Sequence, residues 1–520
     1  MSSPALRAVS QGTRFALCIA FCYLVAASAA AWVHELWRDE THAWLIARDA
    51  TGPLSLLRNL RYDGHPCLWH LCLWPLTRLG GPELMKVLAV AIGTINAFLF
   101  ARYAPFPRLA RGLFAFGYLQ LWEWGAIARN YGIGVLFLLV TAILMVRRER
   151  YPILIGATLA LAANTAAFVA VVVGGLLAML VVERLAPWRQ LERAAPPVRF
   201  WAGIALGTAG ILACAAQVRP PPDCAVGEVW RLQSAWDHLG AAIASPVHGL
   251  ASLPWGGPLE SWTLLRVVQI ALGTVIASTL AVGAGMVLAR RRGAWIAYAL
   301  PALALVVIFF LMYYGGARHA GFILISLLLA LWVAPTYPQR PAAPAGRLGR
   351  TTAWAESHLN AMLAAAFAFQ VGGSVIEAVI DGTGVYSAAG ATAELIRAQG
   401  LAHLPMVADP DAAAANVLAQ LDKDVAFYEN VQRWGSFAIW DSRHAHGGTT
   451  LLSHAPDAAV FSRARSFAER TDLVVLLDHQ ADPEVVSSFH GRLVGARHAD
   501  IRRDESYWVY VVASASIVQR

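Results

Sequence analysis

The sequence predicts an α-helical membrane protein of about eleven spans, with a small soluble α/β domain at its C-terminal end. Three observations lead to this fold class. First, 58% of the 520 residues are hydrophobic and only 14% are charged, which is too apolar for a soluble enzyme. Second, apolar runs of roughly 17–25 residues, the length that crosses a bilayer as a helix, recur up to residue 371. Third, from residue 372 onward the apolar runs shrink to the length of strands.

The predicted membrane domain, residues 1–371, begins with a span at about 15–32. Arg7 and Arg14 precede this span and an acidic stretch follows it directly, which indicates a retained span rather than a cleaved signal peptide. The other predicted spans are a helix at about 83–101, hairpins within 112–146 and 152–182, and helices at about 200–217, 263–289, 293–312, 319–335 and 353–371.

Arginine clusters between the spans set the predicted orientation. Cytoplasmic loops carry an excess of Arg and Lys, so clusters such as Arg147–Arg150 and Arg290–Arg292 are placed in the cytoplasm. The N-terminus is then cytoplasmic, and an odd number of spans puts the C-terminal domain on the extracytoplasmic side of the cell membrane. The same clusters explain the net charge of +8, so nucleic acid is not an expected partner.

Two external loops are predicted on the extracytoplasmic side. The first, about residues 34–82, contains a Trp-rich apolar run at 66–79. That run is short and is interrupted by Pro75, so we expect it to lie at the membrane interface rather than to cross. The second loop, about residues 218–262, is rich in tryptophan.

Residues 372–520 predict an extracytoplasmic α/β domain. The expected strands are Leu404–Ala408, Phe437–Trp440, Leu473–Leu477 and Tyr507–Val512, and the expected helices are Ala388–Gln399 and Asp411–Leu421. The domain has no Gly-rich phosphate loop and no nucleophile elbow. None of the six cysteines lies in it, and neither a metal site nor a cofactor is predicted.

Two adjacent carboxylates, Asp39 and Glu40, follow the first span and are preceded by Arg38. Such a pair can cap a helix, with Asp before the helix and Glu in its first turn. Their place between Trp37 and Trp44, at a membrane interface, favours a second interpretation. A partly desolvated carboxylate there is suited to act as a general base for a hydroxyl or an amine.

A second group of polar residues follows about two dozen residues later. Asp63 and His65 flank a glycine and precede a proline, a pattern that also forms ordinary turns. The functional interpretation is that His65 orients an acceptor or donates to a leaving phosphate.

Two arginines open apolar helices and can bind an anion. Arg129 is followed by Tyr131, and Arg318 is followed by His319. Arginine at membrane depth is costly and usually marks a site, although a lone arginine can extend to the lipid headgroups. Two arginines that face one carboxylate pair suggest binding of a phosphate. Asn164, in the second hairpin, could line a cavity together with these arginines and carboxylates, or it could form a polar turn.

The order of these groups resembles the GT-C superfamily, most closely its protein-mannosyltransferase and aminoarabinose-transferase-like branch. The resemblance spans about residues 10–335 and rests on Asp39-Glu40 in the first external loop, Asp63-x-His65-Pro, and Ala-Arg129-x-Tyr131. It implies an enzyme that transfers a sugar from a polyprenyl-phosphate donor to an acceptor outside the membrane, usually with inversion.

Residue by residue, the resemblance implies that Asp39 is the base and Glu40 the neighbour that orients it or shares the proton. It also implies that Arg129 and Arg318 bind the phosphate. The chain departs from the pattern in three places, with Cys67 after the His-Pro, His319 in place of Tyr, and Asn164 near a usual His. These departures concern the sugar and the acceptor, which is a glycan, a lipid or a protein, more than the reaction.

Two other functions fit a multi-span protein with external charges. A flippase or transporter for lipid-linked sugars would bind the same donor without reaction, and a non-catalytic envelope-assembly protein would use Asp39 only as a cap. A transporter predicts charges spread through the bundle and discontinuous helices in related halves. Here the charges gather at one face and no repeat is found, which favours the transferase.

Overall fold

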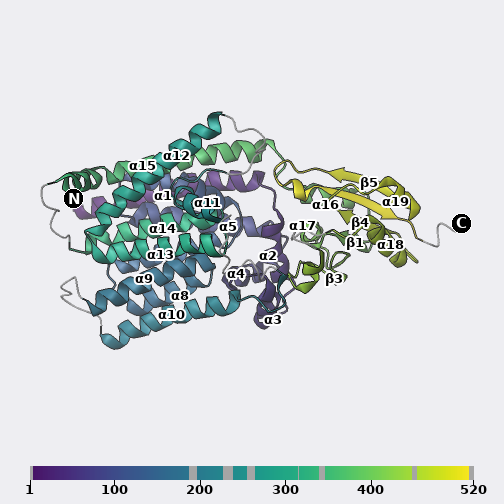
Figure 1. Ribbon diagram of the computed structural model, residues 1–520, viewed down its shortest axis with the longest axis horizontal. Helices are drawn as coiled ribbons and strands as arrows, with labels where there is room; N and C mark the ends of the chain where they lie inside the picture. The colour runs from purple at the N-terminus through teal and green to yellow at the C-terminus, as the bar shows by residue number, and fades with distance from the viewer. Residues whose placement is uncertain are drawn as a thin grey trace.

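The computed structural model describes residues 4–186, 196–225, 238–254, 264–313, 315–338, 346–447 and 454–514. Figure 1 shows a bundle of long helices at one end of an elongated molecule and a sheet with its helices at the other. The described part of the chain begins at the free end of the bundle and ends in the sheet domain, so its first and last elements lie at opposite ends of the molecule (Figure 1).

Eight of the described helices are long and apolar enough to cross a membrane, or nine if one sharply bent pair counts as a span. The eight are α1 (Pro4–Val33), α5 (Leu84–Tyr103), α9 (Ala167–Leu185), α10 (Pro197–Val218), α12 (Leu264–Ala289), α13 (Arg292–Leu311), α14 (Ala317–Val333) and α15 (Arg347–Thr383). Each contains or matches one of the predicted spans, and the protein is therefore a polytopic helical membrane protein, as the sequence predicts.

The sequence predicts about eleven spans, whereas eight or nine are found among the described helices. The difference arises in the two predicted hairpins. In the first, the chain forms α6 (Arg108–Phe116), a π-helical turn η2 (Leu119–Ala126) and then α7 (Tyr131–Met145). A bend of 120° separates η2 from α7. In the second, α8 (Pro152–Ala163) has only 12 residues. At 1.5 Å per residue it is about 18 Å long, short of the roughly 30 Å hydrocarbon core.

Helix α14 is the centre of the bundle. All of its residues except Arg318 are buried, because neighbouring helices cover every face. One neighbour is α11 (Leu239–Leu250), an apolar helix within the stretch predicted as an external loop at 218–262. A Cβ on Gly249 would lie 2.3 Å from the Ala320 carbonyl oxygen, so the two helices approach closely there. Residues 226–237 and 255–263 of that loop lie outside the described residues.

The first external loop folds into short helices between the bundle and the sheet domain (Figure 1). They are α2 (Arg38–Arg48), α3 (Pro53–Asn59), the 3₁₀ turn η1 (Leu60–Tyr62) and α4 (Leu68–Leu76). The run predicted to lie at the interface forms α4, which at nine residues is too short to cross a bilayer.

The C-terminal domain contains a six-stranded sheet in the order β3-β2-β1-β4-β6-β5. Strand β1 is parallel to β2 and β4, and the other pairs are antiparallel. The strands are β1 (Met406–Asp409), β2 (Ala426–Tyr428), β3 (Arg433–Gly435), β4 (Leu473–Leu477), β5 (Gly491–Arg497) and β6 (Tyr507–Val512). The helices are α16 (Ala389–Ala398), α17 (Asp411–Leu421), α18 (Asp457–Phe467) and α19 (Pro483–Ser488).

The prediction of a strand at Phe437–Trp440 is wrong. These residues form an irregular segment outside the sheet, and Phe437 packs in the same apolar cluster as Trp44 of α2. The apolar run therefore reflects burial against the first external loop rather than strand pairing. The predicted start of the C-terminal domain at residue 372 falls inside α15, which continues to Thr383.

Buried hydrogen bonds join the C-terminal domain to the start of α2. The Asn416 side chain of α17 donates to the Leu36 carbonyl oxygen at 3.2 Å and to Glu505 Oε2 at 2.7 Å. It also accepts a hydrogen bond from the Thr41 hydroxyl at 3.0 Å. Glu505, with an exposed fraction of 0%, accepts in turn from the Arg38 backbone N–H at 3.1 Å. These contacts fix the first turn of α2 between the two parts of the molecule.

Candidate active site

A cavity of about 1050 Å³ lies where the bundle, the first external loop and the C-terminal domain meet. Its polar lining residues come from α2, from η1 and the turn after it, from η2 and the start of α7, from the start of α14, from α15 and from the segments that follow α15. Among them are Arg38, Asp39, His42, Arg61, Asp63, His65, Glu123, Arg129, Tyr131, Arg318, His319, Glu377, Tyr386 and Arg502. Eight of the ten site residues predicted from the sequence are in this lining, and Glu40 and Asn164 are not.

Asp39 is placed in the cavity by the start of α2. Trp37 is the last residue before the helix, so Asp39 lies in the first turn, where the helix dipole favours a negative charge. Its side chain is 41% exposed, and Arg129 Nη1 lies 3.9 Å from Asp39 Oδ2. Arg129 also donates to the Asp39 carbonyl oxygen. The carboxylate is thus held beside a cation while it keeps a face open to a ligand.

Four arginines determine the ionisation of Asp39. Burial raises the pKa of this carboxyl, and Arg129, Arg318, Arg38 and Arg502 lower it by more, so the pKa lies below its ordinary value. The group is therefore ionised at neutral pH. A carboxylate in this state can accept a proton or a hydrogen bond from a ligand.

Glu40 lies behind the cavity wall and has an exposed fraction of 0%. Its carboxylate accepts from the Ala128 backbone N–H at 2.6 Å and contacts His34 Nε2 at 3.0 Å. It also accepts from the Trp37 backbone N–H at 3.3 Å, which closes the first turn of α2. Because Ala128 precedes Arg129, Glu40 fixes the positions of Asp39 and Arg129 relative to each other.

Asp63 orients His65 toward Arg129. His65 Nδ1 lies 3.1 Å from Asp63 Oδ2, and His65 Nε2 lies 3.4 Å from Arg129 Nη2. Since arginine only donates, Nε2 is the acceptor and the Nδ1–H donates to Asp63. Burial raises the pKa of Asp63, while His65, His42 and His70 bring it well below its ordinary value.

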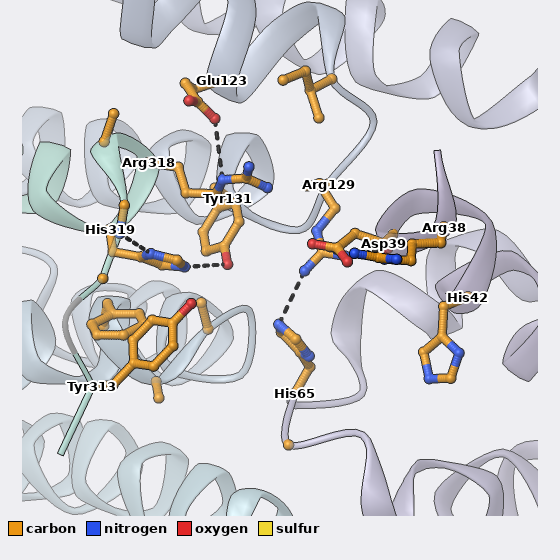
Figure 2. A pocket seen from close by; sticks show the side chains of 18 of the residues that line it. Arg38, Asp39, His42, His65, Glu123, Arg129, Tyr131, Tyr313, Arg318 and His319 are labelled. Carbon is orange, nitrogen blue, oxygen red and sulfur yellow. Dashed lines mark hydrogen bonds and ion pairs between the residues drawn. The ribbon is translucent and has the colours of Figure 1, made fainter. Parts of the chain in front are cut away.

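The opposite wall of the cavity carries Arg318, Tyr131 and His319 (Figure 2). Arg318 Nε lies 3.2 Å from Glu123 Oε2, in the π-helical turn. The backbone N–H of Gly316 donates to His319 Nδ1 at 2.9 Å, so neutral His319 carries its proton on Nε2. This proton is donated to the Tyr131 oxygen at 2.7 Å, which leaves the Tyr131 O–H able to donate to a ligand.

Two predicted substrate-binding residues make structural contacts. Arg38 lines the cavity, yet its guanidinium donates to Asp504 of the C-terminal domain. Asn164 binds the Gly210 carbonyl oxygen at 3.0 Å and accepts from Gln217 at 2.8 Å, both on α10. Asn164 therefore ties the end of α8 to α10 outside the cavity.

Sequence reasoning missed Arg502, which reaches the cavity from the C-terminal domain. Its guanidinium lies 4.0 Å from the ring centre of Trp37, a cation–π contact, and its Nη2 lies 3.4 Å from the Tyr386 hydroxyl. In the sequence, Arg502 is one of two adjacent arginines in a polar loop. No local feature indicates that its side chain lines a cavity rather than facing solvent. Glu123, buried in an apolar segment, could have been found from the cost of placing a carboxylate there.

These features define a multi-pass membrane protein in which a helical bundle, the loop of short helices after α1 and an α/β domain enclose a charged cavity. The structure is similar to the crystal structure of ArnT from Cupriavidus metallidurans in the apo state. The two chains share 14% identity, 99% of each is covered, and the TM-score is 0.51. This likeness confirms the GT-C-like fold predicted from the sequence. No protein-family model matches the chain, and no curated protein matches its sequence.

Proposed function

We propose that this protein is a membrane glycosyltransferase that moves a sugar from a polyprenyl-phosphate donor to an acceptor on the extracytoplasmic face. The observation that carries the proposal is the open Asp39 carboxylate surrounded by four arginines in a cavity of about 1050 Å³. A cavity of this size can hold a sugar phosphate together with part of an acceptor. The ArnT-like fold supports the same class of reaction.

Arg129 and Arg318 are the proposed phosphate ligands. They lie on opposite walls of the cavity (Figure 2), and Glu123 and His65 hold their guanidinium groups in place. Fixed guanidinium groups stabilise the negative charge that develops on a leaving phosphate. Apolar residues at the start of α9 and on α11, such as Phe168 and Ala244, also line the cavity and suit the first part of a lipid chain.

Asp39 is the proposed general base of a single displacement. The acceptor oxygen or nitrogen forms a bond to the anomeric carbon while the bond from that carbon to the phosphate oxygen breaks. The acceptor proton goes to the Asp39 carboxylate, and polyprenyl phosphate leaves with the bonding electron pair. One displacement inverts the configuration of the sugar.

Donor binding would make Asp39 a stronger base. The same arginines that lower the pKa of Asp39 would be partly neutralised by the donor phosphate. The pKa of Asp39 then rises toward its ordinary value, and proton transfer from the acceptor becomes more favourable. Glu40 acts in this proposal as a positioning residue rather than as a second base, because it is fully buried.

The first test is sugar transfer by the purified full-length protein in liposomes with a panel of polyprenyl-phosphate sugars. We expect wild-type protein to release polyprenyl phosphate, and Asp39→Asn to reduce that release by roughly 10²–10⁴-fold, the usual contribution of a general base. Donor binding should be retained, because the arginines remain.

The matched control is Asp422→Asn, an 86% exposed position with a left-handed backbone that asparagine tolerates. This variant should match wild type in folding, donor binding and transfer. Equal transfer by Asp39→Asn and wild type would exclude Asp39 as the base. Movement of intact donor across the bilayer without cleavage, unchanged by Asp39→Asn, would instead favour a flippase.

A further inference from the structure

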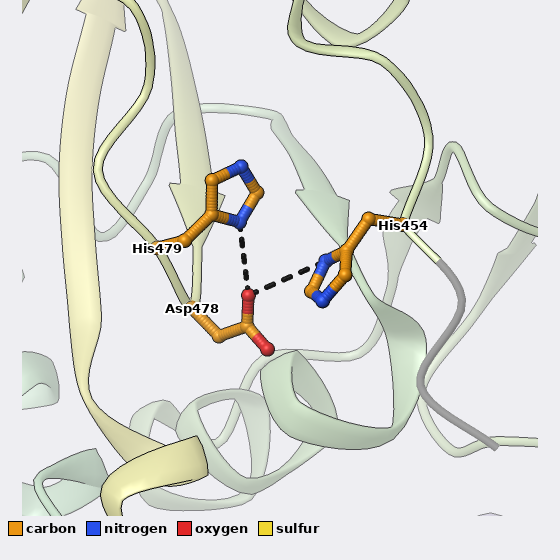
Figure 3. A group of neighbouring side chains, drawn as sticks. All are labelled: His454, Asp478 and His479. Atoms are coloured by element: carbon orange, nitrogen blue, oxygen red, sulfur yellow. Dashed lines mark hydrogen bonds and ion pairs between the residues drawn. The ribbon is translucent and has the colours of Figure 1, made fainter. Parts of the chain in front are cut away.

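A second cluster of polar side chains lies in the C-terminal domain, and none of its members lines the cavity described above. It contains His454, Asp478 and His479 (Figure 3), and the buried Asp409 contacts it through His454. Among the residues that the structure describes, these first three side chains form the one group whose spacing suits a metal ion.

The cluster lies at the carboxyl ends of two neighbouring parallel strands. Asp409 is the last residue of β1, and Asp478 directly follows β4. Strand β2, the next strand after β1 in the chain, pairs with one edge of β1, and β4 pairs with the other. Ligands of open α/β sheets bind where the strand order reverses in this way.

The distances between the side-chain atoms match the edges of a metal coordination sphere. Asp478 Oδ1 lies 3.0 Å from His479 Nδ1 and 3.5 Å from His454 Nδ1, and Asp409 Oδ2 lies 3.4 Å from His454 Nδ1. A tetrahedral ion with bonds of about 2.0–2.1 Å separates its ligand atoms by roughly 3.3 Å. The ligand atoms of His454, Asp478 and His479 all lie within 4.8 Å of one another, and Asp409 adjoins them through His454.

The outer contacts of His479 provide a second, independent indication of a metal ligand. Its Nδ1 faces the cluster, and its Nε2 lies 2.9 Å from Asp457 Oδ1. Asp457 is itself anchored, because it accepts from the Asp482 backbone N–H at 2.9 Å. Histidines that bind metals usually donate their other ring N–H to a carboxylate in this manner, which fixes the ring and the tautomer.

We propose that His454, His479, Asp478 and Asp409 bind a divalent transition-metal ion of the zinc class. Two imidazoles favour such an ion over Mg²⁺ or Ca²⁺, which prefer oxygen ligands. The His454 side chain is 42% exposed, so an ion can enter from solvent, whereas Asp409 is fully buried beneath it. The bound ion would join the chain before α18 to the ends of β1 and β4.

The test measures metal binding by the full-length protein in detergent after removal of bound metal with a chelator. Zn²⁺ content is measured by elemental analysis, and the geometry by the visible absorption of bound Co²⁺. Wild-type protein should bind one more Zn²⁺ per chain than the double variant His454→Ala/His479→Ala, and only wild type should give the intense tetrahedral Co²⁺ spectrum. The control His403→Ala removes an exposed histidine of the same domain and should behave as wild type.

A milder variant separates metal binding from misfolding. Asp457→Asn keeps all four ligand atoms but removes the carboxylate behind His479, so the Zn²⁺ affinity should fall by roughly 10–100-fold while the stoichiometry is retained. A difference of zero ions between wild type and the double variant would overturn the proposal, as would wild-type protein that takes up no Zn²⁺. Either result would make these residues ordinary His–Asp ion pairs. Any Zn²⁺ bound by histidines of the cavity described above would be present in equal amounts in wild type, in His454→Ala/His479→Ala and in Asp457→Asn, because none of these substitutions lies in that cavity.

Discussion

The acid–base behaviour of Asp39 is determined by the cations around it. A carboxylate in a cavity lined by protein would ordinarily have a raised pKa, and burial alone acts in that direction here. The arginines reverse the sign of the shift. Asp39 therefore stays ionised at a pH where an isolated buried carboxyl would already be protonated, and its proposed activity as a base should persist into the acid range.

This leads to a prediction for Arg129→Gln. Loss of the cation raises the pKa of Asp39, so the acid limb of kcat/KM should move to higher pH, because the ionised fraction now falls earlier as the pH decreases. The rate at neutral pH should also drop, by roughly 10²–10³-fold, since phosphate stabilisation is lost. The measurement is kcat/KM for sugar transfer against pH. Arg58→Gln, an exposed position of the same loop, is the control. A lower rate with an unmoved acid limb would mean that another group titrates.

At the scale of elements, three helices meet in a buried group behind the cavity. His34, just after α1, contacts Glu40 of α2 and Asp381 of α15, both at 3.0 Å. Burial lowers the pKa of His34, but the two carboxylates raise it to about 10. A protonated His34 thus neutralises carboxylates that would otherwise repel each other. The group fixes the start of α2, and so Asp39, relative to the bundle.

The pH dependence of stability tests this arrangement. The pKa of His34 in the folded protein lies above its unfolded value of roughly 6.5, so its stabilising contribution is complete below that pH and is lost as the pH rises through about 10. His34→Gln should destabilise the protein near neutral pH by about 3–5 kcal/mol, the usual result of breaking a buried ion pair. It should also flatten the decline of Tm between neutral and alkaline pH.

The measurement is thermal unfolding in detergent across that pH range, with His403→Gln as an exposed control. The control should keep the wild-type Tm and its pH dependence. The interpretation would be wrong if His34→Gln had the wild-type stability, or if its Tm declined as steeply with pH as that of the native protein.

At the scale of the whole molecule, the C-terminal domain completes the cavity. It supplies Arg502 to the lining, and Asn416 and Glu505 hold it against the start of α2. A bundle without this domain would lack one of the cations that act on Asp39. We therefore expect the domain to take part in substrate binding and not only in stability.

Two adjacent arginines allow a matched test of that role. Arg502→Gln should lower kcat/KM for sugar transfer by about tenfold or more, because a guanidinium near the reacting charge is lost. Arg503→Gln, at an exposed position next to it that does not line the cavity, should leave kcat/KM unchanged. Similar kinetics for the two variants would show that Arg502 has no part in the reaction, whereas a lower Tm for Arg502→Gln would indicate a structural role.

The sequence by itself determined the elements whose cause is local. A run of apolar residues crosses the bilayer wherever it is long enough, so α1, α5 and α14 were predictable from length and hydropathy. Strands β4 and β6 were predictable in the same way, because fully apolar runs of that length become buried strands. The polar residues at the starts of α2, α7 and α14 were predictable because charge at a membrane face is costly.

The tertiary structure alone decided which of these residues act together. Glu40 is adjacent to Asp39 in sequence, yet the helical turn directs it to His34 and away from the cavity. Arg502 lies far from Asp39 in the chain and reaches it only through the docking of the C-terminal domain. Local hydropathy determines where a helix or strand forms. Which side chains meet depends on packing between distant segments, for which a single sequence carries no local signal.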